Sequence, residues 1–302
     1  MPLKPDAHCT ARIGLGTVQF GLDYGISNPE GRTPPAEVER ILSLARNRGI
    51  TVLDTAPAYG ESERVLGTFP LREQGFKVVT KTPIFGSGTG ENLARCLYEG
   101  LEASLSKLGI TRAYALLFHR AADLTGGHGS VLVEEARSCR DKGLVEKIGV
   151  SVYTADEIDA VMDRLEPDLV QLPLSVFDQR LLQSGHLDSL RSAGVEIHIR
   201  SVFLQGLLLM DPGRLPPGLA GARAALEAFH AYARGQSRTP LEAALGFALG
   251  LGETDTVICG VNSSGQLEEI CSGASPLPWE DFHEFALADA SILNPSQWSA
   301  GK

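Results

Sequence analysis

The segment TVLDTAPAYGESERVLG, Thr51 to Gly67, sets the pattern from which the fold is predicted. An apolar run typical of a buried strand ends at an acid, Asp54, and Tyr59 follows in a turn-rich loop. Taken singly, Asp54 indicates a strand cap and Tyr59 indicates a packing side chain. A chemical role for the pair therefore depends on whether other strands end in the same way.

Outward from this segment, short runs rich in Val, Ile and Leu recur along the chain, and each precedes a longer stretch with helical spacing. We predict eight strands from these runs: RIGLGT from Arg12, TVLDT from Thr51, KVVTKT from Lys77, YALLFH from Tyr114, KIGVSV from Lys147, LVQLPL from Leu169, EIHIRS from Glu196 and TVICGV from Thr256.

Amphipathic segments between these strands predict helices. In PAEVERILSLARNRG, from Pro35, one face carries four apolar residues: Val38, Ile41, Leu42 and Ala45. In ENLARCLYEGLEASLSKLG, from Glu91, the pattern repeats, and Gly109 stands where a helix would end. Strands that alternate with helices in this way indicate a parallel sheet covered by helices.

Eight such units predict an α/β fold, a (β/α)₈ TIM barrel, and the alternative is a doubly wound sheet. Because no linker divides the chain, residues 1–302 are expected to form a single barrel domain. The long FLQGLLLMDPGRLPPGLAG segment, from Phe203, is expected to be a flexible cover over a site. The last segment, from Pro276 to Trp298, is expected to pack on the barrel as a C-terminal extension.

Composition limits the classes of partner. The 302 residues carry a formal net charge of −10, which argues against nucleic acid and anionic membranes as main partners, because both bind basic surfaces. No apolar run is long enough to span a membrane, and the N-terminus lacks the apolar core of a signal peptide. Five scattered cysteines without a C-x-x-C pair, and no zinc-like histidine spacing, predict a cytoplasmic protein without a metal.

Other predicted strands do end in titratable residues. Strand two ends at Asp54, strand three carries Lys81 at its end, and strand four ends at His119. In a TIM barrel these ends meet at one face, where active sites lie, so the three groups are expected to converge together with Tyr59. Each has an ordinary structural explanation alone, but four together in this order favour catalysis.

Proton delivery is the chemistry that this set can perform. A free tyrosine is a poor acid at neutral pH, but a neighbouring lysine ammonium lowers the pKa of the phenol. Asp54 would hold Lys81 charged and in place, while His119 would orient a substrate carbonyl. Since none of the four is a good carbon nucleophile in this role, a hydride donor is the natural complement.

The chain resembles the aldo-keto reductases over nearly its whole length, from Arg12 to about Ile270. The resemblance rests on RIGLGT, LDTAPAYGESERVLG, TKT, LLFHR, IGVSVY, RSVFLQGLL and VICGVNSSGQLEEI, in this order. It implies a TIM barrel and an NAD(P)H-dependent reductase of aldehydes or ketones, with sugar-like compounds among the candidate substrates. By this resemblance Tyr59 is the general acid and base, Asp54 and Lys81 support it, and His119 orients the substrate.

The resemblance also implies cofactor positions. Ser151 and Gln171 match partners of the nicotinamide carboxamide, and Arg200 replaces a tyrosine that stacks on that ring. Further matched positions are Thr17, Ser201, Leu204, Gly206, Gly260, Asn262, Ser263, Gln266 and Glu269. A cation at position 200 suggests a preference for the reduced cofactor, because it would be repelled by the oxidised one.

Departures from the family pattern leave two questions open. Gly260 and Gln266 stand where many members have cations around the 2′-phosphate, so both NADP(H) and NAD(H) are retained. Together with Val152 and Arg200, they also keep an alternative function open, a weak or inactive NAD(P)H-binding regulatory protein. Tyr24 and Phe85 are candidates for the substrate pocket, and protein partners are not predicted.

Overall fold

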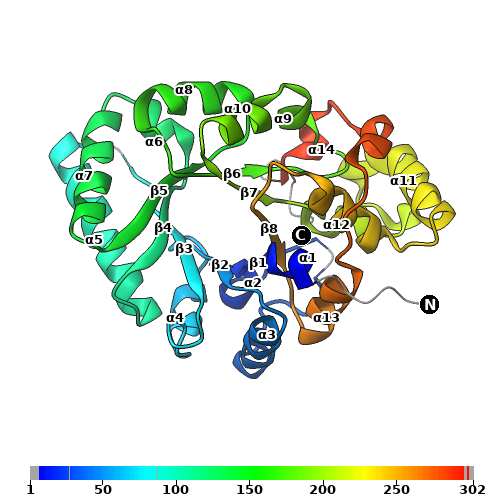
Figure 1. Cartoon of the computed structure of the whole chain (residues 1–302), viewed down its shortest axis with the longest axis horizontal. Coiled ribbons are helices and arrows are strands. Elements are labelled where there is room, and N and C mark those ends of the chain that lie inside the picture. The colour runs from blue at the N-terminus through cyan, green and yellow to red at the C-terminus, as the bar shows by residue number, and fades with distance from the viewer. Residues whose placement is uncertain (1–6, 27, 87, 296–297, 299–302) are drawn as a thin grey trace.

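Eight parallel strands close into a barrel in the computed structural model, which describes residues 7–26, 28–86, 88–295 and 298 (Figure 1). The prediction of a TIM barrel, in preference to a doubly wound sheet, is confirmed. The strands run in chain order: β1 (Ile13–Gly16), β2 (Val52–Asp54), β3 (Lys77–Lys81), β4 (Ala113–Phe118), β5 (Val145–Ser151), β6 (Leu169–Pro173), β7 (Glu196–Arg200) and β8 (Thr256–Gly260).

Helices connect the strands and surround them (Figure 1). In α3 (Pro35–Asn47) the four predicted apolar residues are all buried, and α5 (Gly90–Leu108) ends where Gly109 adopts a left-handed φ of 64°. The α-helices are α1 (Ala7–Ala11), α2 (Val18–Gly21), α3 (Pro35–Asn47), α4 (Ser62–Leu66), α5 (Gly90–Leu108), α6 (Ala121–Thr125), α7 (Gly129–Asp141), α8 (Ala155–Leu165), α9 (Arg180–Gln183), α10 (His186–Ser192), α11 (Arg223–Gly235), α12 (Pro240–Gly250), α13 (Ser264–Gly273) and α14 (Ala290–Leu293).

The register of the strands sets the level of the site. Gly16 at the end of β1 pairs with Asp54 on one side and with Gly260 on the other. The last residues of β1, β2 and β8 therefore share one rim of the barrel. Below this rim the interior is closed by an apolar cluster of Val52, Val79, Ala115, Leu117, Leu169 and Ile258.

The segment after β7 differs from the predicted flexible cover. It forms three short 3₁₀ helices, η1 (Leu204–Leu209), η2 (Pro212–Arg214) and η3 (Pro217–Ala222). Leu204, Leu207, Leu208 and Leu219 are buried. Because these apolar side chains have a place in the core, much of the segment is packed structure instead of an open loop.

The C-terminal segment packs on the barrel, as predicted, although residues 296 and 297 lie outside the described part of the chain. It forms the 3₁₀ helix η4 (Trp279–Phe285) and the short helix α14. Helix η4 contacts α11 and α12. The Phe282 ring lies 5.2 Å from the Tyr232 ring and 5.3 Å from the Phe247 ring, measured between centroids. These aromatic contacts attach the extension to the outer helices.

A turn directly after β6 is buried. Asp178 and Gln179 are buried, and the Gln179 side chain donates to the carbonyls of Val176 and Phe282 at 2.8 Å each. Asp178 is paired with Arg180 at 2.8 Å. The turn thus anchors the extension, since buried amide groups need such partners.

Within the described ranges, no helix is both long enough and apolar enough to cross a membrane.

Candidate active site

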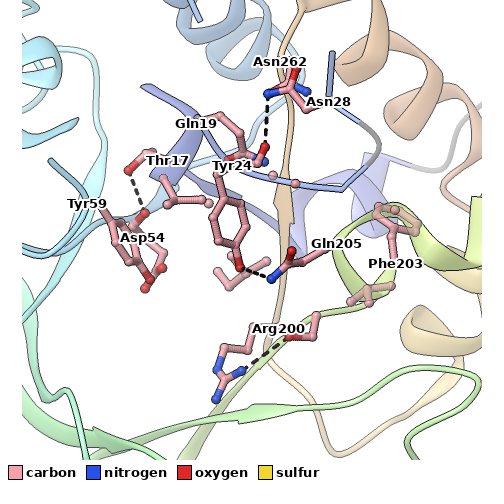
Figure 2. A pocket seen from close by; sticks show the side chains of 18 of the residues that line it. Thr17, Gln19, Tyr24, Asn28, Asp54, Tyr59, Arg200, Phe203, Gln205 and Asn262 are labelled. Atoms are coloured by element: carbon pink, nitrogen blue, oxygen red, sulfur yellow. Dashed lines mark hydrogen bonds between the residues drawn. The ribbon is translucent and has the colours of Figure 1, made fainter. Parts of the chain in front are cut away.

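One cavity of about 410 Å³ opens at the C-terminal ends of the strands (Figure 2). It contains all four predicted catalytic residues, Asp54, Tyr59, Lys81 and His119. The other predicted residues that line it are Thr17, Tyr24, Ser151, Gln171, Arg200, Ser201, Gly206, Gly260, Asn262, Gln266 and Glu269. The strand ends therefore converge on one mouth of the barrel, as predicted.

A buried ion pair lies at the base of the cavity. Lys81 Nζ is 2.7 Å from Asp54 Oδ1 and donates a second hydrogen bond, of 3.0 Å, to the carbonyl of Thr55. Burial alone would lower the pKa of Lys81, but Asp54 and Tyr59 outweigh it, so the net direction is upward. Lys81 is therefore a fixed positive charge at neutral pH.

Tyr59 lies next to this pair. Lys81 Nζ is 4.8 Å from the centroid of the Tyr59 ring. Burial raises the pKa of the phenol above its usual range, and the attraction of Lys81 offsets this only in part. The predicted lowering of the Tyr59 pKa is thus wrong for this state, because desolvation of the phenolate dominates. At neutral pH Tyr59 keeps its proton.

His119 stands directly after β4, beside the tyrosine. The two rings meet edge to face with centroids 6.3 Å apart. Burial, with Lys81 nearby, lowers the pKa of His119 to about 4, so the ring is neutral at pH 7. Its buried Nδ1 has no hydrogen-bond partner within the described part of the chain. A neutral imidazole can offer one N–H to a carbonyl oxygen without adding charge.

Gln171 and Thr17 hold Asp54 in place. Gln171 Nε2 donates to Asp54 Oδ1 at 2.7 Å, while Thr17 donates its hydroxyl to the Asp54 carbonyl at 2.9 Å. Asp54 Oδ1 therefore accepts from both Lys81 and Gln171. The acid is fixed from two strands other than its own.

Several buried polar atoms around the cavity have no partner among the described residues. Buried atoms without a hydrogen-bond partner among the described residues include Gln19 Oε1, His119 Nδ1, Gln171 Oε1 and Asn262 Oδ1. All four side chains line this one cavity. Since buried polar groups are nearly always satisfied, these residues fit a ligand with several polar groups, as a dinucleotide has.

Arg200, at the end of β7, is stacked on a neighbouring ring. Its guanidinium carbon lies 4.2 Å from the centroid of Tyr153, and it donates to the carbonyl of Val152 at 3.0 Å. A weaker contact of 3.4 Å reaches Ser201 Oγ (Figure 2). The guanidinium thus lies over the Tyr153 ring at the cavity wall.

The loop after β7 has unusual backbone geometry. Ser201, Leu204 and Gln205 have φ values of 63°, 46° and 52°, and Gly206 has 95°. Left-handed conformations at three non-glycine residues in a short span are costly and typical of functional loops. Gln205 Nε2 donates to the Tyr24 hydroxyl at 3.0 Å and so joins this loop to the one after β1 (Figure 2).

Three predicted residues lie apart from the cavity lining. Phe85 is buried in the hydrophobic core, and the side chain of Leu204 is buried there too. Ser263 caps α13, where its hydroxyl accepts from the backbone N–H of Gln266. Phe85 is therefore a packing residue, and any role of Leu204 or Ser263 toward a ligand depends on the backbone.

Sequence reasoning missed several lining residues, among them Gln19, Tyr153, Phe203 and Gln205. Gln19 and Tyr153 each lie two or three positions beyond a strand end, and this position was a usable signal. A Cβ at Gly260 would lie 2.4 Å from Gln19 Nε2, so a larger residue there would displace the end of the Gln19 side chain. Phe203 and Gln205 lie within the strained loop, whose backbone conformation no pattern of residues predicts.

Comparisons with known proteins point to one family. A model described as the Aldo/keto reductase family matches residues 12–288. The L-galactose dehydrogenase of Arabidopsis thaliana is 25% identical over 96% of this chain and 93% of its own. A solved aldo-keto reductase of Bacillus halodurans, in its holo form, has a TM-score of 0.73 at 19% identity, covering 92% of this chain and 93% of its own. The glycerol dehydrogenase of Gluconobacter oxydans has a TM-score of 0.71 at 19% identity, covering 91% and 90%.

Proposed function

The chain belongs to the aldo-keto reductase family and is an NAD(P)H-dependent oxidoreductase of carbonyl compounds, and on this premise we propose that Tyr59 is its proton donor and that its substrate is a sugar-like aldehyde or ketone. The observation that carries the proposal is the grouping of Tyr59, Lys81, Asp54 and His119 in one cavity. The sugar-like substrate is supported by the L-galactose dehydrogenase relative.

The chemistry follows from the state of each group. When bound, NAD(P)H supplies the hydride that reaches the carbonyl carbon. Tyr59, protonated at neutral pH, gives its proton to the carbonyl oxygen, and the product is an alcohol. The neutral His119 donates a hydrogen bond to the same oxygen and orients it.

Lys81 makes this proton transfer easier. As Tyr59 loses its proton, the phenolate that develops is stabilised by the ammonium 4.8 Å from its ring centroid. Asp54, held by Gln171, keeps that ammonium in position. The resting phenol is thus neutral, and the stabilisation appears as the charge develops.

We propose that the cofactor is held by Ser151, Gln171, Arg200 and the loop after β7. At the end of the cavity away from Tyr59, we propose Asn262, Gln266 and Glu269 for the same role. The unpartnered Gln171 Oε1 and Asn262 Oδ1 support this assignment. Tyr24, which lines the cavity, is proposed for the substrate pocket. A cytoplasmic location is proposed on the scattered cysteines.

The test is a fluorescence titration of the purified protein with NADH and NADPH, followed by turnover assays on small aldehydes, ketones and sugars. Tyr59→Phe is expected to lower turnover by about 10²- to 10⁴-fold with cofactor binding retained. Tyr98→Phe, on the outer helix α5, is the matched control and is expected to leave turnover unchanged.

The outcomes separate the two candidate functions. Cofactor binding with Tyr59-dependent turnover supports the reductase. Tight binding without turnover on any carbonyl compound would favour the regulatory protein, for which the changes at Val152, Arg200, Gly260 and Gln266 leave room. Absence of binding to either cofactor would refute both.

A further inference from the structure

The start of helix α13 is filled by acceptors that belong to the protein itself. The backbone N–H of Ser264 donates to Glu37 Oε1 at 2.5 Å. The N–H of Gln266 donates to Ser263 Oγ at 3.2 Å, and the N–H of Asn262 donates to Gln266 Oε1 at 2.7 Å. A helix start normally offers such N–H groups to a phosphate, but here those of Ser264 and Gln266 are already used, and so is that of Asn262 just before the helix.

Glu37 brings a full negative charge to this helix start. It reaches across from α3, and its Oε1 also accepts from the Ser264 hydroxyl at 2.7 Å. The other oxygen accepts from Arg40 Nε at 2.6 Å. The hydrogen bonds from Ser264 lower the pKa of Glu37, so the carboxylate is ionised at neutral pH. Only 14% of its side chain is exposed.

The cavity extends from the catalytic groups to this helix. Tyr59 and His119 lie at one end, and Asn262, Gln266 and Glu269 lie at the other. Because the hydride must be delivered beside Tyr59, the adenosine end of an elongated dinucleotide belongs at the α13 end. Phosphate sites in TIM barrels also form frequently at the loops after the seventh and eighth strands.

The charged side chains that line this cavity differ between its two ends. Among the described lining residues the Lys and Arg side chains are Lys81 and Arg200, and both lie at the catalytic end. Glu269 adds a second carboxylate at the α13 end. A 2′-phosphate with a charge of about −1.5 to −2 would therefore meet carboxylates and used N–H groups there.

We propose that this enzyme selects NAD(H) over NADP(H), and that Glu37 sets the selection by occupying the start of α13. The inference rests on the proposed function. Carboxylates near an adenosine ribose favour NAD(H), because they accept from ribose hydroxyls and repel a phosphate. Arg40, a cation that could otherwise serve a phosphate, is bound to Glu37 instead.

The experiment measures equilibrium binding, independently of turnover. Full-length wild type, Glu37→Gln and Glu39→Gln are titrated with NADH and NADPH by fluorescence and by calorimetry. Glu39 is exposed on the same helix, so its variant is a control for the same change in net charge. Glu37→Gln keeps the size of the side chain and an acceptor oxygen for Ser264, so α13 is expected to remain capped.

We expect wild type and Glu39→Gln to bind NADH at least about 30-fold more tightly than NADPH. Glu37→Gln is expected to tighten NADPH binding about tenfold and to change NADH binding much less. The rise of the unfolding midpoint with each cofactor gives a second readout of the same preference.

Three results would contradict this reasoning in distinct ways. Equal or tighter NADPH binding by wild type would overturn the preference while leaving the proposed function intact. An NADH preference that Glu37→Gln leaves unchanged would overturn the role of Glu37. Binding of neither cofactor would instead refute the proposed function.

Discussion

His119 is expected to weaken the fold in acid, because it is partly buried and neutral in the folded protein. In the unfolded chain its pKa is 6.5, and in the folded protein it is about 4. Above pH 6.5 both states are neutral and the ring contributes nothing. As the pH falls, His119 binds a proton in the unfolded chain but not in the folded protein, so stability is lost.

The size of the loss follows from the two pKa values. Below both of them it reaches about 3 kcal/mol, and between pH 7 and pH 5 it amounts to about 2 kcal/mol. His119→Gln removes the titrating group. As the pH falls, the free energy of unfolding of this variant should therefore rise by that amount relative to the free energy of unfolding of wild type. His119→Phe should show the same pH-dependent part, even if its absolute stability differs.

The assay is urea unfolding of the three proteins at several pH values, with ¹⁵N-histidine NMR to assign and titrate the His119 ring. A wild-type minus variant difference that stays constant from pH 7 to pH 5 would refute the argument. So would an NMR titration of His119 close to pH 6.5, since the ring would then be as accessible to protons as in the unfolded chain.

Three further results are expected from the contacts in the structure. Lys81→Met leaves Asp54 buried without its cation, and denaturant unfolding should show a loss of about 3–5 kcal/mol. A milder loss, below about 1 kcal/mol, would mean that solvent reaches Asp54. Tyr24→Phe removes the hydrogen bond from Gln205 that joins the loop after β7 to the loop after β1, so stopped-flow measurement should show cofactor release about fivefold faster. An unchanged rate would show that this hydrogen bond does not help to retain the cofactor. Phe282→Ala should cost about 3–5 kcal/mol in thermal or denaturant unfolding, whereas a neutral effect would show that the extension is not part of the cooperative unit.

The fold was predictable because its signals are local and repeated. Each strand is a short apolar run, and in α3 the spacing of Val38, Ile41, Leu42 and Ala45 identifies the buried face directly. The burial of the turn at Asp178 and Gln179 shows the opposite case. It depends on the contact of Gln179 with Phe282, 103 residues later, and no local pattern contains that partner.

The site was predictable in position but not in electrostatics. Barrel geometry alone brings Asp54, Lys81 and His119 to one rim, so their convergence follows from their places at strand ends. The pKa of Tyr59 is a balance between desolvation and the charge of Lys81, and only the three-dimensional burial decides it. Glu37 escaped notice because its partner, Ser264, is 227 positions away and joins it only in the closed barrel.

The pairing of β1 with β8 has a consequence for the way the protein is made. Residues 13–16 leave the ribosome early, yet their second neighbour in the sheet is residues 256–260, synthesised near the end. Until then β1 and β7 are open edges, available for pairing with another chain. The catalytic groups of β2 to β4 are therefore present long before the site exists. We expect nascent chains stalled before residue 256 to depend on chaperones and to lack cofactor binding altogether.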